Sequence, residues 1–146
     1  MAVVRGCDLP EDLYYFIEKH VWARLESDGL VRIGMTDVAQ NLAKTIIVVR
    51  PKAVGKTLAR TQSAGTVESG KWVGPVPAPV GGEIVEVNGE VIATPSLMNS
   101  DPYGKGWLML IRPSSWESDA AGLATGEVGI AKYREFLEAQ GISCES

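Results

Sequence analysis

Short apolar runs separated by glycine and proline dominate the first 113 residues of the chain. Residues 13–17, 30–33, 45–49 and 107–111 have the length and the β-branched or aromatic content of strands. The run at 45–49 is apolar throughout, and we expect it to be buried. Many short strands joined by Gly- and Pro-rich turns predict a β-sandwich or barrel.

Turn and cap signals divide these strands. Asp28-Gly29 favours a hairpin into the strand at 30–33. Thr36 suits the N-cap of a short helix over 38–43, and residues 95–98 predict one helical turn. The sequence thus predicts a mainly β protein with short helices.

The character of the chain changes after Pro113. Ser114 and Glu117 have the spacing of a capping box. Residues 127–140 carry apolar side chains at helical spacing, and Gly141 provides a C-terminal stop. We expect this helix to pack on the outside of the β unit. The 146 residues then form one domain, with a β core over about 13–112 and a helical extension over about 114–141.

Composition and charge restrict the kinds of partner that the protein is expected to bind. A formal net charge of −4 does not fit a nucleic-acid-binding protein, whereas a protein partner with a basic face suits it. The chain has no apolar run near the roughly 20 residues that span a bilayer, and no signal peptide is evident at its start. We therefore expect a cytoplasmic protein that acts without nucleic acid or membrane.

The chain has two cysteines, Cys7 and Cys144, one near each end. A disulfide framework needs more, and C-x-x-C metal spacing is absent. We expect two unpaired reduced thiols. The alternative is that one of these thiols takes part in thiol–disulfide exchange.

Catalysis by the chain alone is not expected. His20 is the only histidine, and its neighbour Trp22 favours a packed structural role over a base or a metal ligand. Gly55-Lys56-Thr57 resembles the end of a phosphate-binding loop, but Arg50 stands where that loop requires glycine.

Lys71 is the strongest candidate for chemistry. It lies in Glu68-Ser-Gly-Lys71-Trp72, between two predicted strands. This arrangement predicts a hairpin in which Gly70 takes a positive φ at the turn. A lysine at such a tip stands in solvent, where another enzyme can reach it, so we predict a covalently modified lysine.

Five segments in order carry a family resemblance: His20-Val-Trp22, residues 33–40, residues 65–71, residues 80–88 and residues 95–107. They resemble the lipoyl carrier of the glycine cleavage system, the H protein. The resemblance implies a flattened β-barrel or barrel-sandwich hybrid, with lipoate joined by an amide to Lys71. It also implies that Glu68 and Gly82 face the lipoate-attaching enzyme. Gly70 and Trp72, which differ from the family's usual small, polar surroundings of the lysine, are expected to surround the arm.

Three positions depart from this family. Lys19, Val21 and Pro75 stand where glycine cleavage carriers typically have Ser, Glu and Asp, which help to hold a cationic aminomethyl group. Without these amine-holding residues, and with a Glu-Ser-Gly-Lys-Trp-Val-Gly-Pro stretch over residues 68–75, the chain is more similar to the lipoate-binding proteins of bacterial sulfur oxidation, which work with a heterodisulfide-reductase-like complex.

The main interpretation is therefore a non-catalytic, swinging-arm carrier that shuttles sulfur intermediates or reducing equivalents. Its partners would be a lipoate-attaching enzyme, the heterodisulfide-reductase-like complex and a dihydrolipoamide dehydrogenase-type enzyme. One alternative is a glycine cleavage H protein carrying an aminomethyl group, and another is a scaffold without lipoate. The dithiolane would cycle by thiol exchange, Trp72 would rest against the arm, and we expect a monomer.

Overall fold

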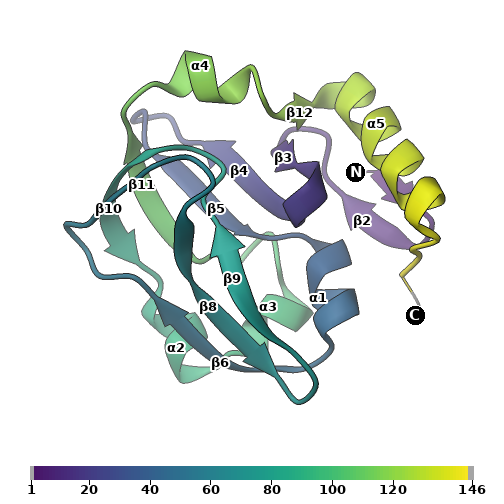
Figure 1. Ribbon diagram of the computed structural model, residues 1–146, viewed down its shortest axis with the longest axis horizontal. Helices are drawn as coiled ribbons and strands as arrows, with labels where there is room; N and C mark the ends of the chain where they lie inside the picture. Colours follow the sequence, from purple (N-terminus) through teal and green to yellow (C-terminus); the bar gives the residue numbers. More distant parts are fainter. Residues whose placement is uncertain (1, 145–146) are drawn as a thin grey trace.

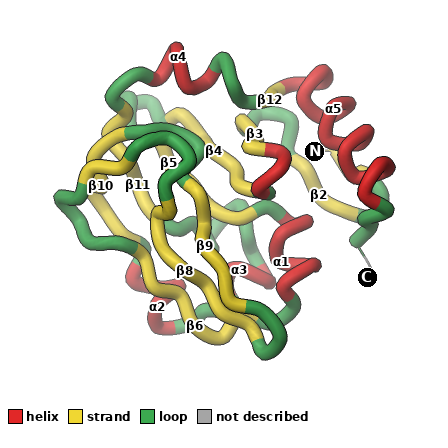
Figure 2. The backbone as a smooth tube through the Cα atoms, in the orientation of Figure 1, coloured by secondary structure: helices red, strands yellow, loops and turns green. Residues whose placement is uncertain are grey.

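The computed structural model describes residues 2–144, which form a largely antiparallel β structure with short helices at its periphery (Figures 1 and 2). This confirms the predicted fold class. The β-sheets remain separate and do not close into a barrel, which is consistent with a barrel-sandwich hybrid. Within residues 2–144, no helix is both long enough and apolar enough to cross a membrane.

The larger sheet has seven strands. In spatial order they are β12 (Ala124–Thr125), β3 (Tyr14–Phe16), β4 (Val21–Leu25), β5 (Val31–Met35), β11 (Met109–Pro113), β10 (Gly82–Val87) and β7 (Thr57–Leu58). The hairpin between β4 and β5 forms as predicted, because Gly29 takes φ 86° and the Leu30 amide donates to Asp28 Oδ1.

The smaller sheet presents the candidate lysine. Its order is β6 (Ile46–Pro51), β8 (Ser63–Ser69) and β9 (Val73–Pro77). Side chains of both sheets fill one core, including Ile33, Val67, Val76, Ile84 and Ile111.

The strand expected at residues 45–49 forms as β6, but the expectation that it is buried throughout is wrong. Ile46 and Val49 are buried, whereas Ile47 is exposed. A register shift between Ile46 and Val48 turns Ile47 outward.

Short helices connect the strands, and a longer helix follows the last of them. They are η1 (Ile17–Lys19, a 3₁₀ turn), α1 (Asp37–Ala43), α2 (Gly89–Ala93), α3 (Leu97–Ser100), α4 (Trp116–Ala120) and α5 (Gly126–Gln140). Thr36 caps α1 as predicted, accepting from the Ala39 amide. The capping box at Ser114 is wrong: Ser115 is the N-cap of α4, without a side-chain hydrogen bond. Gly141 ends α5 in the left-handed conformation, as predicted.

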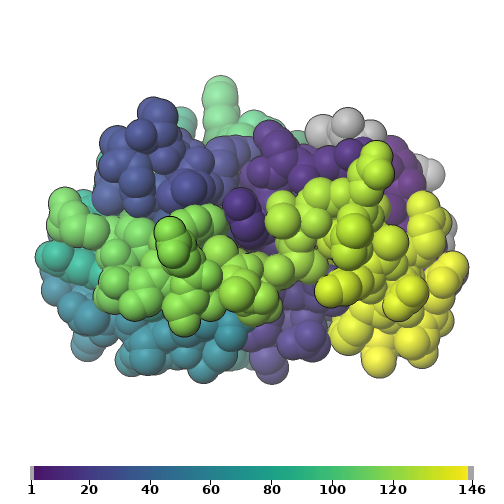
Figure 3. Space-filling view, turned by 90° about the horizontal axis from the view of Figure 1, so that it is seen from above, coloured from purple at the N-terminus to yellow at the C-terminus, as the bar shows by residue number. Residues whose placement is uncertain are grey.

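An N-terminal hairpin that was not predicted is formed by β1 (Ala2–Val4) and β2 (Cys7–Leu9). It lies beside the end of α5, so that the two termini meet at one end of the molecule (Figures 1 and 3). There Cys7 and Cys144 form a disulfide. The expectation of two unpaired thiols is therefore wrong, because residues 137 positions apart in the sequence are neighbours in the fold.

The hairpin and α5 have a core of their own. It contains Leu9 and Leu13 from the N-terminal segment, Trp22 from β4, and Tyr133 and Leu137 from α5. Trp22 packs against the backbone of β5, since a Cβ on Gly34 would lie 2.7 Å from its ring. This second core fixes α5 on the outside of the seven-stranded sheet.

Candidate functional site

Lys71 is exposed at the tip of the hairpin between β8 and β9. The Ser69 amide donates to the Trp72 carbonyl at 2.7 Å, which closes the turn around Gly70 and Lys71. The Lys71 amide also donates to Ser69 Oγ at 3.4 Å. The predicted hairpin is thus present, but Gly70 is not among the glycines with positive φ, so that part of the prediction is wrong.

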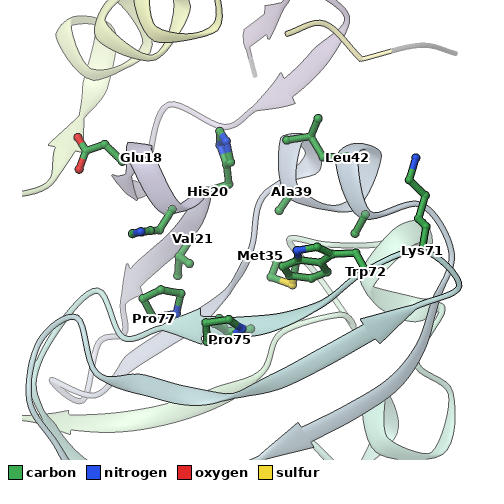
Figure 4. A pocket seen from close by; sticks show the side chains of 13 residues that line it. Glu18, His20, Val21, Met35, Ala39, Leu42, Lys71, Trp72, Pro75 and Pro77 are labelled. Atoms are coloured by element: carbon green, nitrogen blue, oxygen red, sulfur yellow. The ribbon is translucent and has the colours of Figure 1, made fainter. Parts of the chain in front are cut away.

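A groove of about 430 Å³ begins at this hairpin (Figure 4). The hairpin and β9 form one side, α1 forms another, and η1 with the start of β4 closes the far end. The side chains along it are mainly apolar, among them Val21, Met35, Leu42, Trp72 and Pro75. An arm attached to Lys71 would therefore start at one end of an apolar channel.

Trp72 forms part of the groove wall. Its indole lies against Gly74, where a Cβ would approach Cζ2 to 2.2 Å. The ring is turned into the groove, whereas the Lys71 side chain extends past the end of α1 (Figure 4). Trp72 is 40% exposed and Leu42 on α1 is 46% exposed, so both keep apolar surface available for a ligand.

Apart from Lys71 itself, the charged residues among those that line the groove lie at its far end. Glu18 and Lys19 belong to η1, and Glu18 and Lys71 stand at opposite ends of the groove (Figure 4). Among the described residues that line the groove, Glu18 alone carries a carboxylate.

His20 is held by α5 at the same end of the groove. It takes φ 57°, and its Nδ1 shares a hydrogen bond of 2.5 Å with Tyr133 Oη. Tyr133 Oη also lies 3.2 Å from Thr36 Oγ1. Burial lowers the pKa of His20 to about 4, so the ring is neutral near pH 7. These contacts confirm the packed, hydrogen-bonded histidine that the sequence predicts.

The other predicted site residues do not all lie beside Lys71. Gly70 and Trp72 flank Lys71, and Glu68 lies on the last part of β8, where it pairs with Arg50. Gly82 is buried at the start of β10 in the other sheet, where a Cβ would lie 2.1 Å from the Arg112 carbonyl oxygen. A close backbone contact therefore explains that glycine, and the predicted role of Glu68 and Gly82 in ligase recognition stays a prediction.

Sequence reasoning missed the side of the groove that α1 supplies. Ala39, Leu42 and Ala43 line it, and their spacing of three and four residues is the signal of a shared helix face. Within the part of the chain that the structure describes, no group of three or more His, Cys, Asp or Glu side chains could hold a metal ion.

An exposed lysine on a tight hairpin, beside an apolar groove, is the arrangement of a carrier that holds a covalently attached group. Comparison with known proteins identifies the kind of carrier: residues 13–139 match the glycine cleavage H-protein family, and the chain belongs to that family. H proteins are non-catalytic carriers with a lipoate attached covalently to a lysine.

Glycine cleavage H proteins of other organisms are similar to this chain over nearly its whole length. A glycine cleavage system H protein 2 of Aquifex aeolicus is 44% identical over 96% of this chain and 87% of its own length. A probable glycine cleavage system H protein 2 of Saccharolobus solfataricus is 45% identical over 99% of both chains. The crystal structure of an H protein from Mycobacterium marinum superposes with a TM-score of 0.74 at 33% identity, covering 92% of this chain and all of that one.

These findings overturn the sulfur-oxidation interpretation and its heterodisulfide-reductase-like partner. The family match and the relatives point to the glycine cleavage alternative. Val21 and Pro75 do line the groove without offering side-chain acceptors, whereas Glu18 carries a carboxylate at the rim of the same groove.

Proposed function

We propose that this protein is the lipoyl carrier of a glycine cleavage system, with lipoate attached to Lys71 and an aminomethyl group as its passenger. The observation that carries the proposal is the exposure of Lys71 at the hairpin tip, at the open end of an apolar groove. A modifying enzyme needs such access to the amine, and the groove gives the loaded arm a place to rest.

The apolar wall suits the lipoyl chain. Trp72 and Leu42 are both about half exposed and stand on different sides of the groove, one on the hairpin and one on α1. The hydrocarbon part of an arm lying between them would cover apolar surface that the free protein leaves in water. Tethering keeps the reactive end at a high local concentration for each partner enzyme.

The far end of the groove suits a cationic passenger through Glu18. An aminomethyl group is a cation, and its N–H groups need acceptors or negative charge. Glu18 carries both at the rim of this end, with its exposed carboxylate turned outward (Figure 4), and a neutral His20 adds no repulsion. Lys19 opposes the cation, so the position of the passenger would favour the Glu18 side.

The partners follow from this role. A lipoate-attaching enzyme would load Lys71, with Glu68 and Gly70 beside it, and a dihydrolipoamide dehydrogenase-type enzyme would reoxidise the arm. The protein itself would remain non-catalytic, because the chemistry belongs to the cofactor and its partners. We further propose that it works in the cytoplasm, as suits its family.

The test is mass spectrometry of the peptide that contains Lys71 after expression with a lipoate-attaching enzyme. We expect a lipoyl amide in the native chain, none in Lys71→Arg, and undiminished loading in Lys56→Arg, a matched change at another exposed turn. Glycine and the other glycine cleavage components should then add an aminomethyl group to the arm. An unmodified Lys71 would refute the carrier function, and a loaded arm that never accepts the aminomethyl group would refute the passenger.

A further inference from the structure

The cysteines belong to a part of the chain that the family match does not include. The match ends at residues 13 and 139, whereas Cys7 and Cys144 lie outside it. The disulfide joins β2 to the tail that follows α5. We call residues 2–9 together with 126–144 the terminal clasp. Its two arms are distant in sequence and share one covalent bond.

Backbone contacts also hold the tail beside the disulfide. The Cys144 amide donates to the Arg5 carbonyl at 2.9 Å, and Arg5 Nε donates to the Ile142 carbonyl at 2.7 Å. The turn at Gly6 touches the tail directly, since a Cβ there would lie 2.2 Å from the Cys144 carbonyl oxygen. Cys7 is fully buried and Cys144 is 9% exposed, so access to the bond runs through Cys144.

The terminal clasp contacts the walls of the groove by two routes. Along α5, Tyr133 Oη is hydrogen-bonded to His20 at the far end of the groove and lies close to Thr36, the N-cap of α1. Along β2, the Asp8 amide donates to Asp37 Oδ2 at 2.8 Å. Both routes end on elements that line the groove, η1 with its following residue and α1.

A tyrosine strengthens the second route. Tyr103 Oη donates to the Asp8 carbonyl at 2.6 Å and accepts from the Asp37 amide at 2.9 Å. β2 and the start of α1 are therefore connected through one phenol. A change in the position of β2 would therefore displace the N-terminus of α1.

We propose that the Cys7–Cys144 disulfide stabilises the terminal clasp in a redox-dependent way. Its reduction by a dithiol makes the clasp more mobile, and with it the far end of the groove. A thiolate of the dithiol attacks Cys144 Sγ and forms a mixed disulfide, and Cys7 leaves as a thiolate that takes up a proton. The second thiol of the reagent closes its own disulfide and releases Cys144. Two electrons pass from the dithiol to the cysteine pair.

The size of the closed loop explains why this bond matters. The cysteines are 137 residues apart, and a disulfide that closes a longer loop removes more entropy from the unfolded chain. In an environment that keeps most protein thiols reduced, such a bond is open to exchange with dithiols. A dihydrolipoyl group is itself a dithiol, so a reduced arm belongs to the same chemical class as the reagent.

Hydrogen-exchange mass spectrometry of the whole chain, before and after dithiothreitol, tests the proposal. We expect exchange in residues 127–140 and 17–20 to rise about tenfold on reduction, with residues 63–69 of β8 unchanged. The melting temperature should fall by roughly 5–15 °C. Lys71→Arg, measured in parallel, should respond in the same way, because it cannot carry an arm that dithiothreitol could reduce.

The Cys7→Ser/Cys144→Ser double variant is the matched control and should behave as the reduced protein with or without reductant. Two alkylatable thiols in unreduced native protein, or equal exchange in residues 127–140 and 17–20 before and after reduction, would overturn the proposal. Looser 127–140 with unchanged 17–20 would overturn its link to the groove. These readouts need no lipoate, so failure of the proposed carrier function would leave them unaffected.

Discussion

Trp72 is the residue whose environment departs furthest from that of an ordinary hairpin side chain. It follows the exposed Lys71, yet its ring turns back over Gly74 and forms part of the groove wall. Glycine at position 74 is what permits this conformation. The sequence predicted that Trp72 rests against the arm. It could not predict the orientation of the indole ring, because that orientation depends on a glycine two residues further along the strand.

Replacing Trp72 with alanine should expose the lipoyl arm of the loaded protein. One aromatic contact contributes about 1 kcal/mol, which corresponds to a roughly fivefold faster reduction of the arm by an external reductant. Val73→Ala is the control, since Val73 is 64% exposed and does not line the groove. Equal rates in the two variants would mean that the arm does not rest on Trp72.

His20 should make stability depend on pH. Its pKa is about 4 in the folded protein and about 6.5 when unfolded, so between these values the unfolded chain binds more protons. The contribution is complete above pH 6.5 and is lost as the pH falls to 4, amounting to about 3 kcal/mol in the free energy of unfolding.

Urea unfolding of the native chain and of His20→Asn, at pH 7 and pH 4.5, measures this contribution. Asparagine tolerates the positive φ of position 20 and does not titrate. The difference in free energy between the two proteins should shrink at the lower pH. A difference that stays constant would show that His20 titrates normally.

At the scale of elements, local signals located most of the structure. The Asp28-Gly29 turn, the Thr36 cap and the Gly141 stop all act where the sequence predicts, because each is a short-range interaction of backbone and side chain. Local signals failed where contacts with distant segments of the chain determine the structure. The exposure of Ile47 follows from a register shift against β8, and the hairpin of β1 with β2 is held by α5 and the tail.

Thr36→Ala should reveal how α1 is tied to α5. The change removes the cap on Ala39 and leaves Tyr133 Oη with His20 as its side-chain partner. We expect the free energy of unfolding to fall by about 1–2 kcal/mol, measured by urea unfolding. Thr45→Ala, at an exposed position, is the control and should change little. A loss of similar size in both would argue against a special role for the cap.

At the scale of the whole molecule, the fold class and the exposed lysine could be predicted, whereas the second core and the completed groove could not. The core around Trp22 and Tyr133 joins residues from β4 and α5 that no local pattern relates. The groove similarly needs η1, α1 and the hairpin to meet. Glu18 has no distinguishing neighbours in sequence, so its place at the far end became visible only in three dimensions.

The meeting of the two termini has a consequence for the covalent shape of the chain. With Cys7 joined to Cys144, the backbone between them is a closed ring. One peptide cut in an exposed loop, such as that around Gly55, would open the ring without releasing a fragment, and the two pieces would separate only after reduction. The oxidised protein can therefore be nicked and still remain a single molecule.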